Sequence, residues 1–348
     1  MDLRRELEAR EDRLLSPNAA RSARSRGRLH PEEECPLRPA FQHDRDRILY
    51  SKAFRRLKHK TQVFLAPTGD HYRTRLTHTL EVAQIARTLA RALALNEDLT
   101  EAIALGHDLG HTPFGHAGES VLDELLPEGF RHHRQSLRVV DRLEKDGRGL
   151  NLTYEVRMGI LHHAKGRGRF LPAPGEDEPH LTLEAQLVRA ADVMAYIAHD
   201  TDDALRGQVI RPQELPPGVV EVLGGRLSRQ IDTMVRDLIT QTRAAGGAAI
   251  RMSPEVEAAM WELREFLYRR VYDNPEVHAD FIKASKILRE LFHRLMEDEA
   301  LYRRQIGEPP SGEGQRRRAV ADYIAGMTDR FALALYDELF LPRPWARL

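Results

Sequence analysis

The sequence is poor in cysteine, with Cys35 as its single example among 348 residues. One cysteine cannot form a disulfide within the chain, and it cannot supply the cysteine cluster of a structural zinc site. The charged N-terminus lacks the apolar stretch of a signal peptide, and no apolar run approaches the ~20 residues that a membrane-spanning helix needs. We therefore expect a cytoplasmic protein with no membrane partner.

The sequence also lacks a net charge, because Lys plus Arg and Asp plus Glu both number 53. A balanced chain has no global basic field that would attract nucleic acid or an anionic membrane, so any anion site must be local. Histidine is the informative residue type, with sixteen examples, many of them near carboxylates in the first two hundred residues. Such clusters are candidates for metal or catalytic sites.

Apolar residues repeat with a helical period through most of the chain, and we find no convincing strand pattern and no internal repeat. Residues 1–15, 75–93 and 99–109 are predicted helices, and a further helix begins near His116. A short hairpin around Phe170 is the only exception that we expect. The predicted fold class is therefore all-α.

The densest chemical signal is the segment HDLGHTPFGHAGE, residues 107–119, which holds three histidines and two carboxylates with helix breakers between them. Buried charge is costly unless it is paired or bound to metal, and a mixture of imidazole and carboxylate suits a divalent ion that keeps exchangeable waters. A histidine-rich surface loop is the alternative, and the dense spacing disfavours it. The segment predicts a metal or catalytic site.

Periodicity alone leaves two further candidates undecided. His78 shares the apolar stripe of its helix, where a core histidine satisfied by a backbone carbonyl would look the same as a metal ligand. Asp192 belongs to a polar stripe with Tyr196, His199 and Asp203, which fits a solvent-facing surface as well as the wall of a polar cavity.

The order of His78, the pair His107-Asp108 and the distant Asp192 resembles the H…HD…D pattern of the HD superfamily of metal phosphohydrolases. Within that superfamily the chain resembles the bacterial deoxyguanosine triphosphate triphosphohydrolases, also called dNTP triphosphohydrolases, over roughly residues 20 to 280. The joint occurrence of the matching strings is highly specific. These strings are Phe54-Arg55-Arg56-Leu57, Lys60-Thr61-Gln62-Val63-Phe64, Tyr72-Arg73-Thr74-Arg75, residues 107–119, His132 to Ser136 and Asp192 to Asp203.

The resemblance implies an HD-domain helical bundle with one divalent ion per subunit, Mn²⁺ or Mg²⁺. It also implies that His116 and Glu119 are the catalytic pair and that His111 reaches the phosphates. The pair is three residues apart at a helix start, so that the carboxylate can fix the imidazole tautomer. The implied metal ligands are His78, His107, Asp108 and Asp192.

The resemblance further implies a set of substrate contacts. Gln62 and Asp200 fall where the family contacts the 3′-hydroxyl, Arg75 points toward phosphate, and Tyr196 lies against the sugar. The complete implied set is Gln62, Val63, Arg75, His132, Tyr196, Asp200 and Tyr272. The implied reaction cleaves a dNTP, dGTP or another, to deoxynucleoside and tripolyphosphate.

The domain organisation follows from this resemblance and from Gly- and Pro-rich breaks, the best of which is 211–218. We expect an N-terminal arm over residues 1–43, a metal-dependent catalytic core over 44–210, and a C-terminal helical region over 211–348 packed on the core. Within the arm, the stretch Arg21–Arg28 is expected to be either a solvated basic tail or a contact for phosphate or another subunit. By family analogy we expect a homo-oligomer, a hexamer, with a second dNTP as allosteric activator.

Two alternatives come from other functional classes. One is an HD-type nucleotidase or phosphodiesterase acting on monophosphates or cyclic nucleotides, which would share the H…HD…D core but not the strings around Gln62, His116 and Glu119. The other is a nucleotide-sensing or single-stranded DNA-binding protein that uses its arginine-rich segments for phosphate contacts. The intact ligand set argues against an inactive enzyme.

Overall fold

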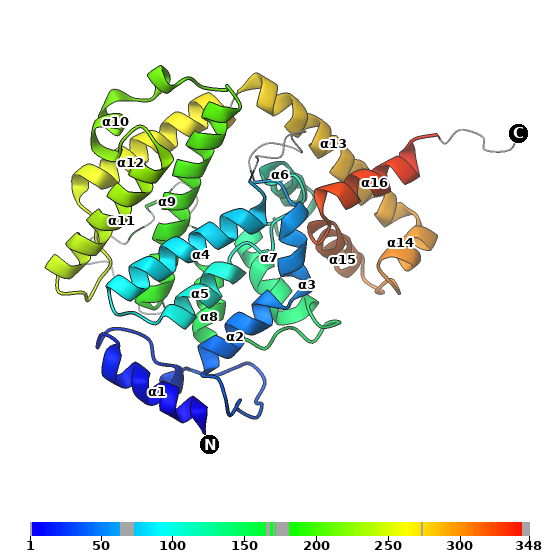
Figure 1. Ribbon diagram of the computed structural model, residues 1–348. Helices are drawn as coiled ribbons and strands as arrows, with labels where there is room; N and C mark the ends of the chain where they lie inside the picture. Colours follow the sequence, from blue (N-terminus) through cyan, green and yellow to red (C-terminus); the bar gives the residue numbers. More distant parts are fainter. Residues whose placement is uncertain are drawn as a thin grey trace, which may run out of the picture.

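The computed structural model describes residues 2–62, 73–164, 168–169, 171, 181–272 and 274–342. Within these ranges the chain forms sixteen α-helices and no β-strand, which confirms the all-α fold predicted from periodicity (Figure 1). Two isolated bridges, Arg28 with Thr153 and Thr61 with Thr74, are the only strand-like pairings there. The hairpin expected around Phe170 lies outside the described residues.

The helices divide into eight before residue 165 and eight after residue 181. The first eight are α1 Leu3–Leu14, α2 Ala40–Leu49, α3 Lys52–Arg56, α4 Arg75–Ala92, α5 Glu97–Gly106, α6 His116–Leu125, α7 His132–Arg138 and α8 Tyr154–Leu161. The others are α9 Leu183–Arg206, α10 Pro217–Leu223, α11 Leu227–Ala244, α12 Pro254–Leu267, α13 Pro275–Glu297, α14 Glu299–Gln305, α15 Glu313–Ala325 and α16 Asp329–Phe340. Among the described residues, no helix is both long and apolar enough to cross a membrane.

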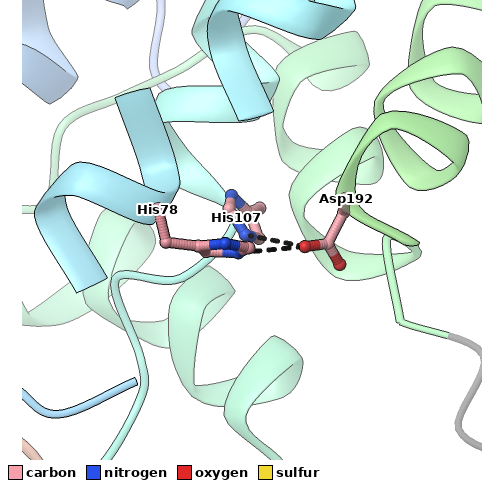
Figure 2. A group of neighbouring side chains, drawn as sticks. All are labelled: His78, His107 and Asp192. Atoms are coloured by element: carbon pink, nitrogen blue, oxygen red, sulfur yellow. Dashed lines mark hydrogen bonds and ion pairs between the residues drawn. The ribbon is translucent and has the colours of Figure 1, made fainter. Parts of the chain in front are cut away.

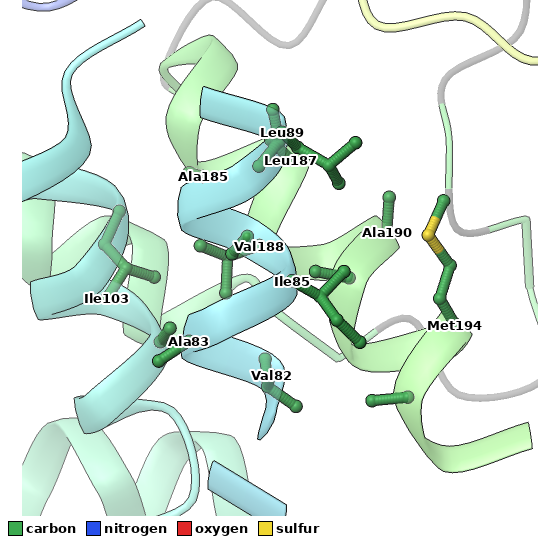
Figure 3. Close-up of a cluster of buried hydrophobic side chains, with 14 of the residues drawn as sticks. Val82, Ala83, Ile85, Leu89, Ile103, Ala185, Leu187, Val188, Ala190 and Met194 are labelled. Atoms are coloured by element: carbon green, nitrogen blue, oxygen red, sulfur yellow. The ribbon is translucent and has the colours of Figure 1, made fainter. Parts of the chain in front are cut away.

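Helices α4, α5 and α9 form the centre of the molecule. Thr74 starts α4 with a capping box, and Asn96 starts α5 by accepting a hydrogen bond from the backbone of Leu99. The apolar stripe of α4 packs against α5 and α9, as the buried side chains in Figure 3 show. Burial of each large aliphatic side chain contributes about 1.5–3 kcal/mol, so this packing fixes the three helices relative to one another.

A second, smaller core joins the C-terminal helices to α6. It contains Phe114 and Leu122 from the region of α6, Phe292 from α13, and Ile324 from α15, all buried. The larger core continues through α9 into α10, α11 and α12. Apolar residues on both sides of the boundary expected at residues 210/211 belong to this larger core. The boundary itself stays a prediction.

The N-terminal arm is held against the rest of the chain, which corrects the expectation of a solvated or partner-bound basic stretch for two of its arginines. Arg21 donates hydrogen bonds to the backbone carbonyls of Leu15, Ser16 and Ala19. Arg28 pairs with the buried carboxylate of Asp44. A buried carboxylate needs such a partner, so Arg28 ties the arm to α2. Arg21 holds the arm's own turn through its three carbonyl contacts.

Candidate metal centre and substrate pocket

Three helices bring the predicted metal ligands together. His78 lies on α4, His107 directly follows the end of α5, and Asp192 lies in the middle of α9. In Figure 2 both imidazole rings point at the same carboxylate oxygen. Asp192 Oδ1 lies 3.1 Å from His78 Nε2 and 3.6 Å from His107 Nε2. Ligands held at about 2.1 Å around an octahedral ion lie about 3 Å apart, so these separations suit one bound ion.

The hydrogen bonds of His107 determine which of its nitrogens can bind a metal. Its Nδ1 lies 2.7 Å from the backbone carbonyl of Ala104, which can only accept, so Nδ1 carries the proton. The lone pair of Nε2 then faces the site, and this buried nitrogen has no hydrogen-bond partner. An acceptor nitrogen near the carboxylates of Asp108 and Asp192 is unfavourable unless a cation lies between them, so the residues fit a divalent metal.

Asp108 connects this group to a second one. Its Oδ1 lies 3.3 Å from His107 Nε2 and 3.2 Å from His111 Nε2, and its Oδ2 accepts a hydrogen bond from Arg75 at 3.0 Å. Burial opposes ionisation, but the adjacent histidines and Arg75 hold the pKa of Asp108 well below its ordinary value. Asp108, His111 and His132 form a second cluster of ligand atoms within 4.8 Å of one another.

Glu119 lies closer to His132 than to His116, its expected partner, and the role of His116 and Glu119 as a catalytic pair stays a prediction. Glu119 accepts hydrogen bonds from both the backbone amide and Nδ1 of His132, each at 3.0 Å, while His116 Nδ1 is 3.9 Å away. The start of α7 presents two donors to the carboxylate. The His116 side chain is instead 75% exposed. Glu119 therefore orients His132, and although burial opposes it, this hydrogen bond raises the pKa of His132.

Sequence reasoning missed His163, which follows α8. Its Nδ1 lies 2.7 Å from the carbonyl of Ile160, and its Nε2 lies 3.3 Å from Nε2 of His132. His132 also stacks on His111, with ring centroids 4.0 Å apart. No periodic pattern in the sequence predicts His163 as a site residue, because its partners lie on segments that are remote in the sequence.

These groups open into one pocket beside the metal centre. Predicted residues that line it are Gln62, Arg75, His78, Asp108, His111, His116, His132, Asp192, Tyr196, Asp200 and Tyr272. Arg264 and Tyr268 also line it, from a C-terminal segment that the sequence offers as a possible nucleotide contact, whereas His163 and Arg189 were not predicted as site residues. His107 and Glu119 are not among the residues that line the pocket, and Val63 lies outside the described residues.

The far wall of the pocket comes from α9 and the turn after α12. Asp192, Tyr196 and Asp200 are four residues apart and therefore share one face of α9. Tyr272 donates a hydrogen bond to Asp200 Oδ2, while Oδ1 is buried without a partner. Burial raises the pKa of Asp200 to about 7 despite this hydrogen bond. The wall thus presents an acceptor oxygen beside aromatic rings.

The helices and the converging histidines and aspartates define an HD domain, and residues 75–197 match the model of that family. Residues 250–338 match the phosphohydrolase-associated domain. The chain is 54% identical to a deoxyguanosinetriphosphate triphosphohydrolase-like protein of Desulfatibacillum aliphaticivorans, with 99% of each chain covered. A protein of the same description from Caldanaerobacter subterraneus is also 54% identical, with 99% of this chain and 98% of that one covered.

A more distant relative of the same description, from Bordetella pertussis, is 43% identical over 94% of this chain and 96% of its own length. The chain therefore belongs to the deoxyguanosinetriphosphate triphosphohydrolase-like family. It is a hydrolase of the HD phosphohydrolase type.

Proposed function

We propose that this protein hydrolyses deoxynucleoside triphosphates, dGTP among them, to deoxynucleoside and tripolyphosphate. One observation supports this most directly. A single pocket joins the cluster of His78, Asp108 and Asp192 to a wall of Tyr196, Asp200 and Tyr272. The first part suits a metal-bound phosphate, and the second suits a sugar whose hydroxyl groups need acceptors and an aromatic face.

The proposed metal ligands are His78, His107, Asp108 and Asp192. A divalent ion bound there, Mn²⁺ or Mg²⁺, would act as a Lewis acid on a phosphoryl oxygen. Two imidazoles and two carboxylates suit Mn²⁺ somewhat better than Mg²⁺, which prefers oxygen ligands and water. One ion per subunit satisfies this ligand set.

The chain's own residues then bind the substrate and move the proton. Water adds to the α-phosphorus while the bond from phosphorus to the 5′-oxygen breaks, so the leaving deoxynucleoside takes up a proton. His116, exposed at the pocket, shuttles that proton, and Glu119 keeps His132 oriented toward the phosphates with His111 and Arg75 beside it.

The sugar end of the substrate gives the proposed selectivity. Asp200 Oδ1, a buried acceptor with no partner, receives the 3′-hydroxyl together with Gln62. Tyr196 lies against the sugar and crowds its 2′ position, where the extra hydroxyl of a ribonucleotide would clash or remain unpaired. Val63 and Tyr272 complete the proposed set of substrate contacts.

Product analysis tests the proposal. Purified protein is incubated with each dNTP alone and with an equimolar mixture, with Mn²⁺ or Mg²⁺, and the products are resolved by anion exchange. We expect tripolyphosphate, absent for the His107→Ala variant. Pyrophosphate or orthophosphate as the product would contradict the proposal, and turnover of only mono- or cyclic nucleotides would favour the nucleotidase or phosphodiesterase alternative.

The same experiment addresses the partners expected from the family. Faster hydrolysis in the mixture than with any single dNTP would indicate the expected activating nucleotide, and light scattering of the same sample would measure the expected hexamer. Salt-dependent binding of single-stranded DNA that survives His78→Ala would favour an added binding role. The cytoplasmic location stays a prediction from composition.

A further inference from the structure

A buried carboxylate in the C-terminal region holds two segments of the pocket together. Asp329, the first residue of α16, is 5% exposed. Its Oδ1 accepts a hydrogen bond from the backbone amide of Phe114 at 3.0 Å. Its Oδ2 accepts from the backbone amide of Thr61 at 2.9 Å and also from the Thr61 hydroxyl. One side chain thus fixes residues that are 268 and 215 positions away in the sequence.

Both of these segments lead directly into the pocket. Thr61 immediately precedes Gln62, and Phe114 lies between His111 and His116. Gln62, His111 and His116 line the pocket. Phe114 has a φ of 60°, a left-handed conformation that is rare for a bulky residue and needs support from its surroundings. The hydrogen bond from its amide to Asp329 supplies such support.

Lys60 makes a parallel link between the same parts of the chain. Its ammonium group is buried and donates to the backbone carbonyl of His111 and, at 2.7 Å, to that of Ala325 at the end of α15. The C-terminal region therefore contacts the loop that carries His111 and His116 through two polar connections, in addition to the apolar core that it shares with α6.

We propose that Asp329, supported by Lys60, is a positioning residue that sets the distance between Gln62 and the histidines of the loop, residues 111–116. This inference rests on the proposed function, in which those groups contact opposite ends of the substrate. A misplacement of about 1 Å in such a site typically costs about 100-fold in rate. Asp329 does not line the pocket, so its effect reaches substrate only through Thr61 and Phe114.

The test compares Asp329→Asn with a matched control. Asparagine keeps one acceptor oxygen but turns an NH₂ group toward a backbone donor. Glu144 is also a buried carboxylate that accepts from two backbone amides, one on each oxygen, those of Lys52 and Ala53, and it does not line the pocket. Glu144→Gln therefore reports what the loss of such an acceptor does to stability alone.

We expect Asp329→Asn to lower kcat about 10- to 100-fold, with KM and the affinity for Mn²⁺ close to wild type. Glu144→Gln should have a melting temperature similar to that of Asp329→Asn but keep the kcat of wild type. Equal kcat values in the two variants would overturn the proposal. If Asp329→Asn does not fold, Lys60→Met removes the parallel link, and the same fall in kcat is expected from it. A wild-type kcat in Lys60→Met would then count against the proposal.

Hydrogen exchange separates failure of this inference from failure of the proposed function. In wild type we expect slow exchange at the amides of Thr61 and Phe114, and fast exchange at both in Asp329→Asn, without any substrate. If wild type hydrolyses no dNTP, the proposed function fails, and exchange alone decides the positioning role. Unchanged exchange at both amides in Asp329→Asn would overturn it.

Discussion

Replacing Gly110 with alanine should move His132 away from His111 and from the metal ligands. Gly110 lies in the loop after His107-Asp108 and packs directly against the backbone of α7, where its amide donates to Ser136 Oγ at 2.9 Å. A Cβ at this position would lie 2.5 Å from the carbonyl oxygen of His132 and closer still to the amide nitrogen of Ser136. Ordinary contact begins at 3.4 Å and the amide nitrogen of Ser136 would lie at 2.1 Å, so α7 would have to move by about 1.3 Å.

This displacement carries His132 away from His111 and from the metal ligands, since His132 is the first residue of α7. Overpacking of this kind costs about 1–3 kcal/mol in stability, and a shift near 1 Å costs about 100-fold in rate. Thermal unfolding and steady-state kinetics measure the two effects. We expect Gly110→Ala to fold, to melt earlier, and to lose about 100-fold in kcat.

Gly106→Ala is the matched control. A Cβ at Gly106 would lie 2.5 Å from Cδ1 of Ile160, which is the end of a flexible side chain rather than backbone. The side chain can rotate away, so this variant should lose stability but keep kcat within a few-fold of wild type. If Gly110→Ala retained both the melting temperature and the kcat of wild type, the argument from backbone contact would be refuted.

Three further predictions concern the charged groups of the site. His107→Ala should reduce the amount of bound metal to the level that remains after treatment with EDTA, because Nε2 of His107 faces the carboxylates of both Asp108 and Asp192. Mass spectrometry of the purified protein measures the bound metal. Retention of a full equivalent of metal would contradict the role of His107 as a ligand. Glu119→Gln should lower the pKa of His132 in an NMR titration, because the carboxylate raises it; an unchanged value would contradict the pairing. The free energy of unfolding of Asp200→Asn should increase relative to that of wild type as pH rises, because wild type alone loses stability. Burial raises the pKa of Asp200 from 3.8 to about 7, so the folded wild type binds a proton that the unfolded chain releases, and its stability falls through that window by at most about 4 kcal/mol. Urea unfolding at pH 4.5 and pH 8 measures this, and an equal difference between the two proteins at both pH values would contradict it.

Local patterns predicted the helices and motif similarity predicted the convergence of the ligands. The stripe on residues 75–93 became α4. His78, His107 and Asp192 form one group of ligand atoms, and Asp108 lies beside it, 3.3 Å from His107 Nε2; the role of these four residues as metal ligands stays a prediction. Periodicity could not separate a solvent face from a pocket wall on α9, and the structure answers this, because Tyr196 lines the pocket whereas His199 is 2% exposed.

Contacts between remote segments were beyond the reach of sequence patterns. Spacing placed Glu119 on the same helical face as His116, but its stronger partner is His132, thirteen residues away, which offers two donors. The roles of His163 and Asp329 depend in the same way on neighbours from distant parts of the chain, and neither position carries a periodic or motif signal. Pairing of buried polar groups is decided by tertiary packing, which periodicity does not encode.

The small core that joins α6 to the C-terminal helices bears on how this protein can be divided. Phe114 and Leu122 belong to the part matched by the HD domain, yet they are buried by Phe292 and Ile324, which belong to the part matched by the phosphohydrolase-associated domain. Cutting the chain between the two would expose apolar side chains next to His116 and would leave the amide of Phe114 without its acceptor. The two matched regions are thus units of sequence similarity and share one unit of folding, so a shortened catalytic fragment is a poor starting point for engineering.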